Sequence, residues 1–331
     1  MEKKILIVGG SGYIGTVTVN HFLKKNYKVV CIDNLLYGQN KSLKQFLSKK
    51  NFTFLKIDLR DILKIDKAIK NSQNILILAG LVGDPITKKY KKLSHSINYE
   101  GIKKLINRCK NIKNIKRLVF VSTCSNYGIG KKVLLNENSK LKPLSLYSKQ
   151  KVKIEKFLIK MKKTHFTTTI LRFATAFGLS PRMRFDLTIN HFTKSFLDKD
   201  NLKIYDPNTS RPYCHVLDFA RAIEVVFKSK PKKIDREIFN VGDTKQNYSK
   251  KQIIDKISKH ISKTKILLLK KGVDKRDYRV DFRKIKKILN FKTKYSIDYG
   301  IREIKKFLIK NKRLKRNIKN LGNFEIRNKF I

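Results

Sequence analysis

Short apolar runs alternate along the first half of the chain with longer segments in which apolar positions recur every three or four residues. The short runs predict buried strands at residues 4–8, 28–32, 52–57, 75–78, 117–122 and 168–172. The longer segments predict helices at residues 13–25, 62–69 and 90–109, and a further helix that carries Tyr147. Strands that alternate with helices are typical of a parallel sheet covered on both faces. We therefore predict an α/β fold built on a doubly wound parallel sheet.

Charge is the unusual feature of the composition. The chain has 331 residues, of which 41% are hydrophobic, and this fraction is typical of a globular protein. A formal net charge of +53 would favour a nucleic acid or an anionic membrane as partner. The lysines, however, are scattered as pairs along polar helix faces, and no nucleic-acid-binding motif accompanies them. We expect no specific nucleic-acid partner.

Cysteines, histidines and apolar runs predict neither a metal site nor a membrane anchor. The four cysteines form no Cys-x-x-Cys pair, and the six histidines are dispersed. The longest apolar stretch, Ile75 to Val82, is far shorter than the roughly 20 residues that span a bilayer. Met1 to Lys4 precede only a short apolar run, unlike a signal peptide. We expect a cytoplasmic protein without membrane insertion.

A glycine-rich turn follows the first predicted strand. Gly9, Gly12 and Gly15 stand between this strand and the next helix, which is the arrangement that binds a pyrophosphate. The second strand ends at Asp33, whose carboxylate can accept both hydroxyls of a ribose and would repel a 2′-phosphate. Together, these features predict binding of NAD in preference to NADP.

Tyr147 and Lys151 stand four residues apart on a predicted helix, so they share one face. A tyrosine has an ordinary pKa of about 10, so it needs nearby positive charge to act as a base at neutral pH. An adjacent ammonium group favours the phenolate. The pair is read together with Thr123, which ends an earlier strand. On its own the spacing could equally belong to an ordinary helix surface, because lysine is so common here.

Motifs spread over nearly the whole chain resemble those of the extended short-chain dehydrogenases/reductases. The resemblance is to their NAD-dependent nucleotide-sugar epimerase/dehydratase family, similar to UDP-glucose 4-epimerase. The motifs are Gly9-Gly10-Ser11-Gly12-Tyr13-Ile14-Gly15, Asp33-Asn34, Asp58-Leu59-Arg60, Leu78-Ala79-Gly80, Asn98-Tyr99-Glu100-Gly101, Ser122-Thr123-Cys124-Ser125-Asn126-Tyr127-Gly128, Tyr147-x-x-x-Lys151, Leu171-Arg172-Phe173-Ala174-Thr175-Ala176-Phe177-Gly178, Arg211-Pro212-Tyr213-Cys214-His215-Val216-Leu217-Asp218 and Tyr278-Arg279-Val280-Asp281.

The resemblance implies roles for individual residues. Tyr147 would be the base, Lys151 would bind the nicotinamide ribose and tune Tyr147, and Thr123 would hydrogen-bond the reacting hydroxyl. The residues implied at the NAD site are Gly9, Gly12, Tyr13, Ile14, Gly15, Asp33, Asn34, Asp58, Leu59, Ala79, Gly80, Asn98, Ser122, Tyr147 and Lys151. Asp33 would hold the adenine ribose, and Asp58 and Leu59 would hold the adenine.

The resemblance also implies a substrate and a domain organisation. Arg211 and Arg276 would bind the diphosphate of a nucleotide-diphosphate sugar, and Asp84 would either face the sugar or cap a turn. We expect a Rossmann-type NAD-binding domain at 1–178, to which 212–245 return. A smaller substrate-binding domain would comprise 179–211 and 246–316, and 317–331 would form a solvated basic tail. A homodimer is also expected.

One departure from the family narrows the expected activity. The 4,6-dehydratases of the family carry an Asp-Glu pair directly after the active-site threonine, where this chain has Cys124 and Ser125. The leading hypothesis is an NAD-dependent epimerase that oxidises the sugar transiently, at C4. The alternatives are a nucleotide-4-ketosugar reductase and, from another class, a non-catalytic NAD-sensing or nucleic-acid-binding protein.

Overall fold

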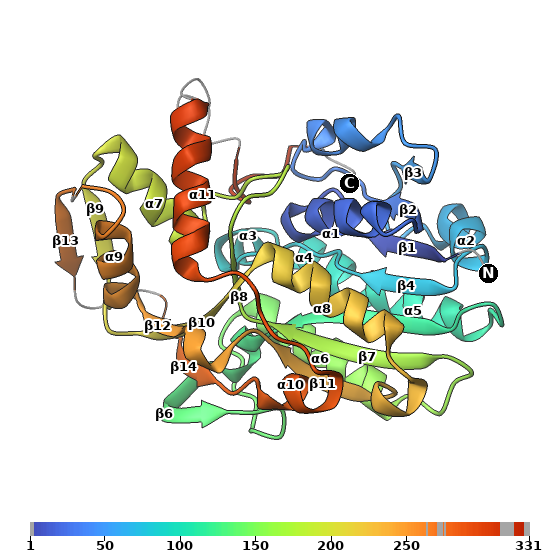
Figure 1. Cartoon of the computed structure of the whole chain (residues 1–331). Coiled ribbons are helices and arrows are strands. Elements are labelled where there is room, and N and C mark those ends of the chain that lie inside the picture. Colours follow the sequence, from blue (N-terminus) through green and yellow to red (C-terminus); the bar gives the residue numbers. More distant parts are fainter. Residues whose placement is uncertain (1–2, 263, 270–273, 275, 312–320, 328–331) are drawn as a thin grey trace.

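A parallel sheet forms the centre of the molecule. The computed structural model describes residues 3–262, 264–269, 274, 276–311 and 321–327. In this part of the chain seven strands lie in one sheet (Figure 1). From edge to edge they are β11 (Glu237–Val241), β7 (Thr167–Phe173), β5 (Arg117–Thr123), β4 (Asn74–Ile77), β1 (Lys4–Val8), β2 (Lys28–Ile32) and β3 (Phe52–Leu55). All paired neighbours are parallel, so the predicted fold class is confirmed.

Helices cover both faces of this sheet. Side chains alternate between its faces, so Ile5 and Ile7 belong to one apolar core while Leu6 and Val8 belong to the other. The first core contains residues of α1 (Tyr13–Lys24), α8 (Val216–Lys228) and α10 (Arg283–Leu289). The second contains residues of α2 (Ile62–Lys70), α5 (Ile102–Lys110) and α6 (Leu146–Lys160). The strand order reverses between β1 and β4, which is where sheets of this type bind their ligands.

The segment after β4 differs from its predicted form. A single helix was expected over 90–109, but the chain forms α3 (Asp84–Lys89), α4 (Lys91–His95), a π turn (Ser96–Gly101) and then α5. A π turn inserts an extra residue into the helix and redirects the side chains around it. Here the side chain of Asn98 leaves the helix and pairs with the backbone of Leu81.

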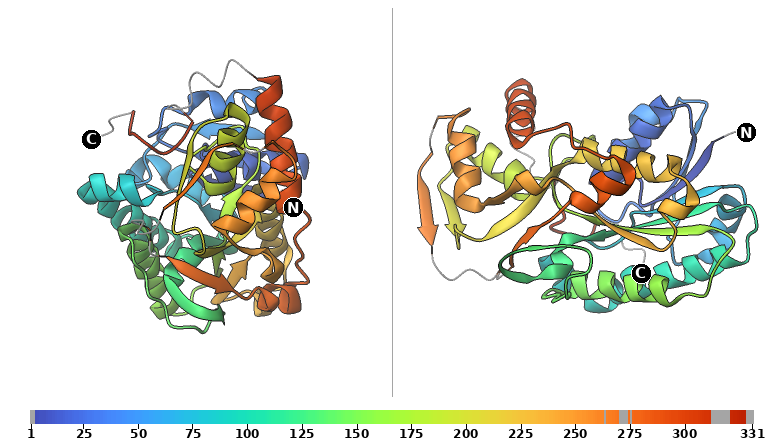
Figure 2. Two further views of the ribbon diagram at one scale, coloured as in Figure 1. Left: turned by 90° about the vertical axis from the view of Figure 1, so that its left-hand side faces the viewer. Right: turned by 60° about the horizontal axis from the view of Figure 1, so that its bottom comes forward.

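A smaller lobe stands beside the sheet (Figure 2). Its apolar core includes residues of α7 (Thr188–Asp198), α9 (Lys250–Ser258) and α11 (Ile297–Lys310). The short strands outside the central sheet include β8 (Thr175–Phe177), β9 (Leu202–Tyr205), β10 (Ser210–His215), β12 (Asn247–Ser249) and β13 (Ile266–Leu269). Two further strands, β14 (Asp277–Val280) and β6 (Ile129–Leu135), pair with each other. No helix among the described residues is long and apolar enough to cross a membrane.

Residues 321–327, near the end of the chain, lie against the loop after β2 and against the segment after β8 (Figure 1). Leu321 O accepts a hydrogen bond from Phe185 N at 2.8 Å, and Arg327 N donates to Leu36 O at 3.0 Å. The expectation of a solvated tail therefore does not hold for this described segment. Its apolar residues Leu321 and Ile326 pack against the cores, a contact that a count of basic residues could not reveal. The rest of the predicted tail lies outside the described residues.

The ion pair between Glu155 and Arg172 is buried between α6 and β7. The side chains are 1% and 3% exposed, and Arg172 Nη2 lies 2.7 Å from Glu155 Oε2. Glu155→Ala should lower the free energy of unfolding by about 3–5 kcal/mol, because Arg172 would remain buried without its counter-charge. Urea denaturation would measure this loss. Lys70→Ala removes a largely exposed pair with Asp66 and should cost less than about 1 kcal/mol. Similar losses in both variants would contradict the prediction.

Candidate active site

A cavity of about 810 Å³ lies at the switch point of the sheet, between the sheet and the smaller lobe. It brings together nearly all of the residues that the sequence predicted for the site. Those that line it are Gly9, Gly12, Tyr13, Ile14, Gly15, Asp33, Asn34, Leu59, Ala79, Gly80, Asp84, Ser122, Thr123, Tyr147, Lys151, Arg211 and Arg276. Residues from segments far apart in the sequence therefore meet around one space.

The glycine turn is shaped to bring backbone close to a ligand. Gly9 has a φ of 90°, and a Cβ there would lie 2.5 Å from Ala79 N, so no other residue fits. A side chain at Gly15 would collide with the backbone of Gly9 and Gly10. The helix α1 begins at Tyr13, and its cap Gly12 contributes no side chain that could occupy the free N–H groups. These groups are therefore available to an anion such as a pyrophosphate.

The carboxylate of Asp33 is held at the end of β2. It accepts hydrogen bonds from Leu35 N at 2.8 Å and from Ser11 N at 3.1 Å. Burial raises the pKa of Asp33, while the hydrogen bond from Ser11 acts in the opposite direction. Because these donors fix its position beside the glycine turn, the carboxylate can meet the hydroxyls of a ribose. The turn and Asp33 together fit NAD.

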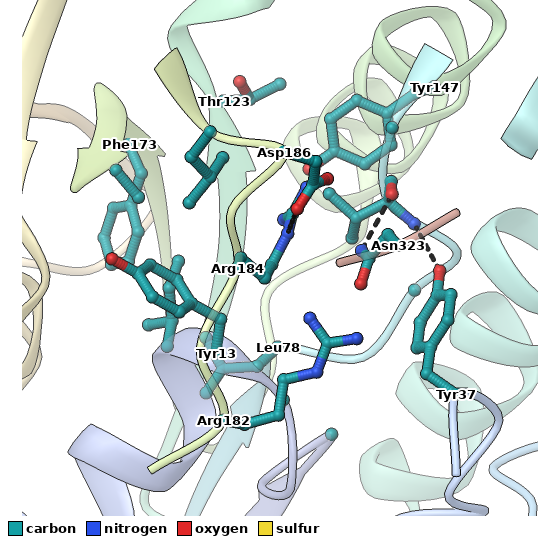
Figure 3. Close-up of a pocket in the computed structure, with 18 of the residues that line it drawn as sticks. Tyr13, Tyr37, Leu78, Thr123, Tyr147, Phe173, Arg182, Arg184, Asp186 and Asn323 are labelled. Atoms are coloured by element: carbon teal, nitrogen blue, oxygen red, sulfur yellow. Dashed lines mark hydrogen bonds and ion pairs between the residues drawn. The ribbon is translucent and has the colours of Figure 1, made fainter. Parts of the chain in front are cut away.

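Tyr147 stands in the first turn of α6. Ser145 caps this helix through a capping box with Ser148, which fixes the point at which the helix begins. The Tyr147 ring lines the cavity together with Thr123 at the end of β5 (Figure 3). Burial raises the pKa of Tyr147 well above its ordinary value, although Arg184 acts against this shift. The stabilisation of a Tyr147 phenolate by Lys151 stays a prediction, and in the protein alone burial is the largest influence on the pKa of Tyr147.

Lys151 lies on the same face of α6, one turn further along. Its Nζ donates to Val121 O at 2.8 Å and lies 5.8 Å from the centre of the Tyr147 ring. The side chain is almost fully buried, and burial lowers its pKa to about 7. The amine of Lys151 is therefore largely desolvated and lies one helical turn from Tyr147. An anionic or polar ligand in the cavity would favour its charged form.

Three residues at and after the end of β5 have different surroundings. Thr123 Oγ1 accepts from Ser125 N at 3.0 Å, so its hydroxyl proton is free to face the cavity. The Ser122 hydroxyl instead donates to Glu155 in the protein interior. Cys124 is 1% exposed and its Sγ donates to Arg172 O, so it cannot act as an acid in the cavity. Of the two residues that replace the Asp-Glu pair, only Ser125 borders the cavity.

Arg211 and Arg276 meet at the far end of the cavity, and both contact Asp274. Arg276 Nη2 lies 2.7 Å from Asp274 Oδ2 and 3.1 Å from Asp84 Oδ2, while Arg211 Nη2 lies 3.1 Å from Asp274 Oδ1. These contacts hold the pKa of Asp274 well below its usual range, against the effect of burial. An incoming diphosphate would compete with these carboxylates for the two guanidinium groups.

Asp58 and Asn98 are the predicted site residues that do not line the cavity. The Asp58 carboxylate accepts from Arg60 Nε at 2.9 Å and from Asn34 Nδ2 at 2.8 Å. Asn98 is fully buried, and its Oδ1 accepts from Leu81 N at 2.7 Å. Both side chains therefore form hydrogen bonds with other residues of the protein and do not border the cavity. Their contact with a cofactor stays a prediction.

Several lining residues were not identified from the sequence. They are Tyr37, Arg182, Arg184, Asp186 and Asn323 (Figure 3). Arg184 and Asp186 form an ion pair within the segment that follows β8. Nothing in the sequence indicated Asn323, because its contact with Val82 joins residues 241 positions apart in the chain.

Comparison with known proteins identifies the family. Residues 5–242 match the model of the NAD dependent epimerase/dehydratase family, and the chain therefore belongs to it. An uncharacterized UDP-glucose epimerase of Bacillus subtilis is 30% identical over 72% of this chain and 76% of its own length. NAD is the cofactor of this family, in agreement with the turn and carboxylate described above.

Solved structures agree with this assignment. The dTDP-glucose 4,6-dehydratase of Bacillus anthracis, in complex with NAD, has a TM-score of 0.81 and 25% identity, covering 96% of this chain and 99% of that one. The fold is shared by a UDP-N-acetylglucosamine 4-epimerase of Methanobrevibacter ruminantium in complex with UDP-N-acetylmuramic acid, with a TM-score of 0.83 and 24% identity, covering 94% of this chain and 99% of that one. The neighbours thus include both epimerases and dehydratases.

Replacement of Lys151 should change how stability depends on pH. Its pKa is about 7 in the folded protein, whereas an unfolded chain would have an ordinary lysine value of about 10.4. Between these values the unfolded state binds more protons, so wild-type stability rises with pH. The cost of the buried charge is fully present below pH 7 and is lost as the pH approaches 10. Lys151→Met should therefore raise the melting temperature of the cofactor-free protein more near pH 6 than near pH 10.

A matched control for this experiment is Lys149→Met, because Lys149 is an exposed lysine on the same helix. Its substitution should leave the pH dependence of the melting temperature unchanged. An equal shift at both pH values in Lys151→Met would show that the folded protein does not depress the pKa of Lys151.

Replacement of Asp33 should weaken the discrimination between NAD and NADP. Asp33→Ala removes the carboxylate that would accept hydrogen bonds from the ribose hydroxyls and repel a 2′-phosphate. We expect the ratio of the two affinities to fall about tenfold or more, as measured by titration calorimetry. Asp255→Ala, at an exposed position on α9, should leave the ratio unchanged. A wild-type protein that already prefers NADP would contradict the role given to Asp33.

Proposed function

We propose that this protein is an NAD-dependent epimerase of a nucleotide-diphosphate sugar, acting by transient oxidation, at C4. The observation that carries the proposal is the single cavity that joins a nucleotide-binding turn to Tyr147, Lys151 and Thr123. The paired arginines at its far end supply sites for a second, substrate diphosphate. A non-catalytic NAD sensor would need the nucleotide-binding turn. It would need neither the group of Tyr147, Lys151 and Thr123 nor the paired arginines.

Tyr147, Thr123 and Lys151 would have different roles in the proposed reaction. Tyr147 would accept the proton of a ring hydroxyl that also hydrogen-bonds to Thr123. Lys151 would bind the nicotinamide ribose, and its positive charge would help to stabilise the Tyr147 phenolate. Bound NAD supplies the group that takes a hydride from the sugar carbon and later returns it. The ketosugar would turn within the cavity before the hydride returns to its other face.

The cofactor would lie along the wall formed by the glycine turn and Asp33. Gly9, Gly12 and Gly15 would approach its pyrophosphate, and Asp33 its adenine ribose. Leu59 would border the adenine. Tyr13 would support the turn from within, because its hydroxyl donates to Gly178 O at 2.6 Å.

Arg211 and Arg276 would bind the substrate diphosphate at the other end of the cavity. They would have to exchange their contacts with Asp274 and Asp84 for contacts with phosphate oxygens. Charge-assisted, bidentate hydrogen bonds to phosphate make this exchange favourable.

The residues after Thr123 favour epimerisation over dehydration. Elimination of water from a 4-ketosugar needs an acid and a base in addition to the tyrosine. At the two positions concerned, Cys124 is buried with a pKa well above its ordinary value, and Ser125 is a neutral hydroxyl. The Ser125 hydroxyl contacts the hydroxyl of Tyr278 at 3.3 Å and accepts from Arg276 Nη1 at 3.4 Å. Neither residue is suited to remove a proton from C5.

Replacement of Tyr147 tests the proposal directly. Tyr147→Phe should lower the turnover number by about a hundredfold to ten-thousandfold, because only the proton acceptor is lost. The affinity for NAD should remain within about threefold of the wild type. Activity within about tenfold of the wild type would remove Tyr147 from the role of base.

An isotope experiment separates an epimerase from a ketosugar reductase. The wild-type protein should interconvert two nucleotide sugars without added cofactor, and deuterium on the inverted carbon should remain there in ordinary water. Mass spectrometry of the sugars would measure both results. Consumption of added reduced cofactor in equal amount with a 4-ketosugar would instead establish the reductase.

A further inference from the structure

Arg182 is a buried cation whose side chain is incompletely paired. It is 6% exposed, and its guanidinium lies 5.2 Å from the centre of the Tyr37 ring. Nη2 donates to Gly322 O at 3.0 Å, but Nη1 has no hydrogen-bond partner among the described residues. Burial lowers the pKa of Arg182 to about 10, so the group remains charged at neutral pH. A buried charged donor without a partner is costly unless a ligand satisfies it.

The backbone around Arg182 is fixed over the beginning of α1. Ser180 Oγ donates to Tyr13 O at 2.7 Å and lies 2.9 Å from Thr16 Oγ1. Arg182 N in turn donates to Ser180 Oγ at 3.2 Å. Arg182 is thereby held near the free N–H groups of the first turn of α1, on the wall of the same cavity.

Other charged residues of the cavity wall influence the charge of Arg182. They include Arg184 and Asp33, and Asp33 is the predicted partner of the adenine ribose. The pyrophosphate of a dinucleotide lies between its two riboses. In Figure 3 the side chain of Arg182 lies between Tyr37 and Tyr13, and Tyr13 begins α1, the helix at whose N-terminus the pyrophosphate is expected.

Residues 321–327 contact Arg182 and the residues around it. Beyond the bond from Arg182 to Gly322, Asn323 Nδ2 donates to Val82 O at 2.9 Å. Val82 N contacts the hydroxyl of Tyr37, on whose ring Arg182 lies. The segment thus connects the walls of the cavity on both sides of the guanidinium, and Asn323 and Phe324 line the cavity itself.

We propose that Arg182 binds the pyrophosphate of NAD opposite the glycine turn, and that residues 321–327 form a strap that positions it. Nη1 would donate to a phosphate oxygen while Nη2 keeps its bond to the strap. The pyrophosphate would then be held from two sides, by the N–H groups of α1 and by the guanidinium. The inference rests on the cofactor placement proposed above, but it does not depend on whether the reaction is an epimerisation.

Binding of cofactor fragments tests this role without any measurement of activity. ADP contains the pyrophosphate, whereas adenosine does not, so titration calorimetry of the cofactor-free protein with both separates the two contributions. In Arg182→Met the affinities for ADP and NAD should fall by about tenfold to a hundredfold, while that for adenosine stays within about threefold. Arg302→Met removes an exposed arginine of α11 and should leave all three affinities unchanged. Circular dichroism would establish that each variant is folded.

A second variant tests the strap and provides a result if Arg182→Met fails to fold. Deletion of 321–331 removes the carbonyl that orients Arg182, so the rate of NAD dissociation should rise about fivefold or more. Stopped-flow exchange of NAD would measure this rate. Equal ADP affinity in wild type and Arg182→Met, or an unchanged NAD dissociation rate after the deletion, would overturn the inference. If the wild type itself binds adenosine but gains nothing from the pyrophosphate, the cofactor placement fails as well.

Discussion

The buried ion pair between Glu155 and Arg172 connects the parts of the fold on which the active site depends. Arg172 comes from β7 and Glu155 from α6, the helix that also carries Tyr147 and Lys151. The Glu155 carboxylate also accepts from Ser122 at the end of β5. One carboxylate therefore connects the helix that carries Tyr147 to the strand that ends in Thr123. Its burial is tolerated because the guanidinium and the neighbouring hydroxyl satisfy most of its hydrogen-bonding capacity.

The cavity itself concentrates positive charge that the protein does not fully neutralise. Lys151 and Arg182 are both buried, and burial lowers the pKa of each. At the far end Arg211 and Arg276 are paired, but they share the carboxylate of Asp274. Such a site is electrostatically prepared for ligands with phosphate groups, because their charges offset the cost of burying the cations. The large net charge of the chain is a separate matter, since Lys151, Lys194 and Lys250 are the only described lysines that line the cavity.

Local sequence determined the fold class and most of the site. The glycine turn and the acid at the end of the second strand are patterns whose backbone geometry follows from a few adjacent residues. The spacing of Tyr147 and Lys151 is likewise converted into a shared face by the helix alone. The alternation of apolar runs and amphipathic segments predicted the parallel sheet, because each element must bury its own apolar face. The glycines of the turn, Asp33, Tyr147 and Lys151 all line the cavity.

Tertiary structure decided the remainder. Asp58 accepts a hydrogen bond from Asn34, and Asn98, which lies in the π turn, accepts one from Leu81; these contacts join residues 24 and 17 positions apart in the sequence. Arg182 and Asn323 enter the cavity through contacts between segments separated by more than a hundred residues. A sequence motif reports the backbone conformation of adjacent residues, whereas these contacts depend on the packing of distant ones. The position of Arg182 and of residues 321–327 could therefore be found only once the chain was folded.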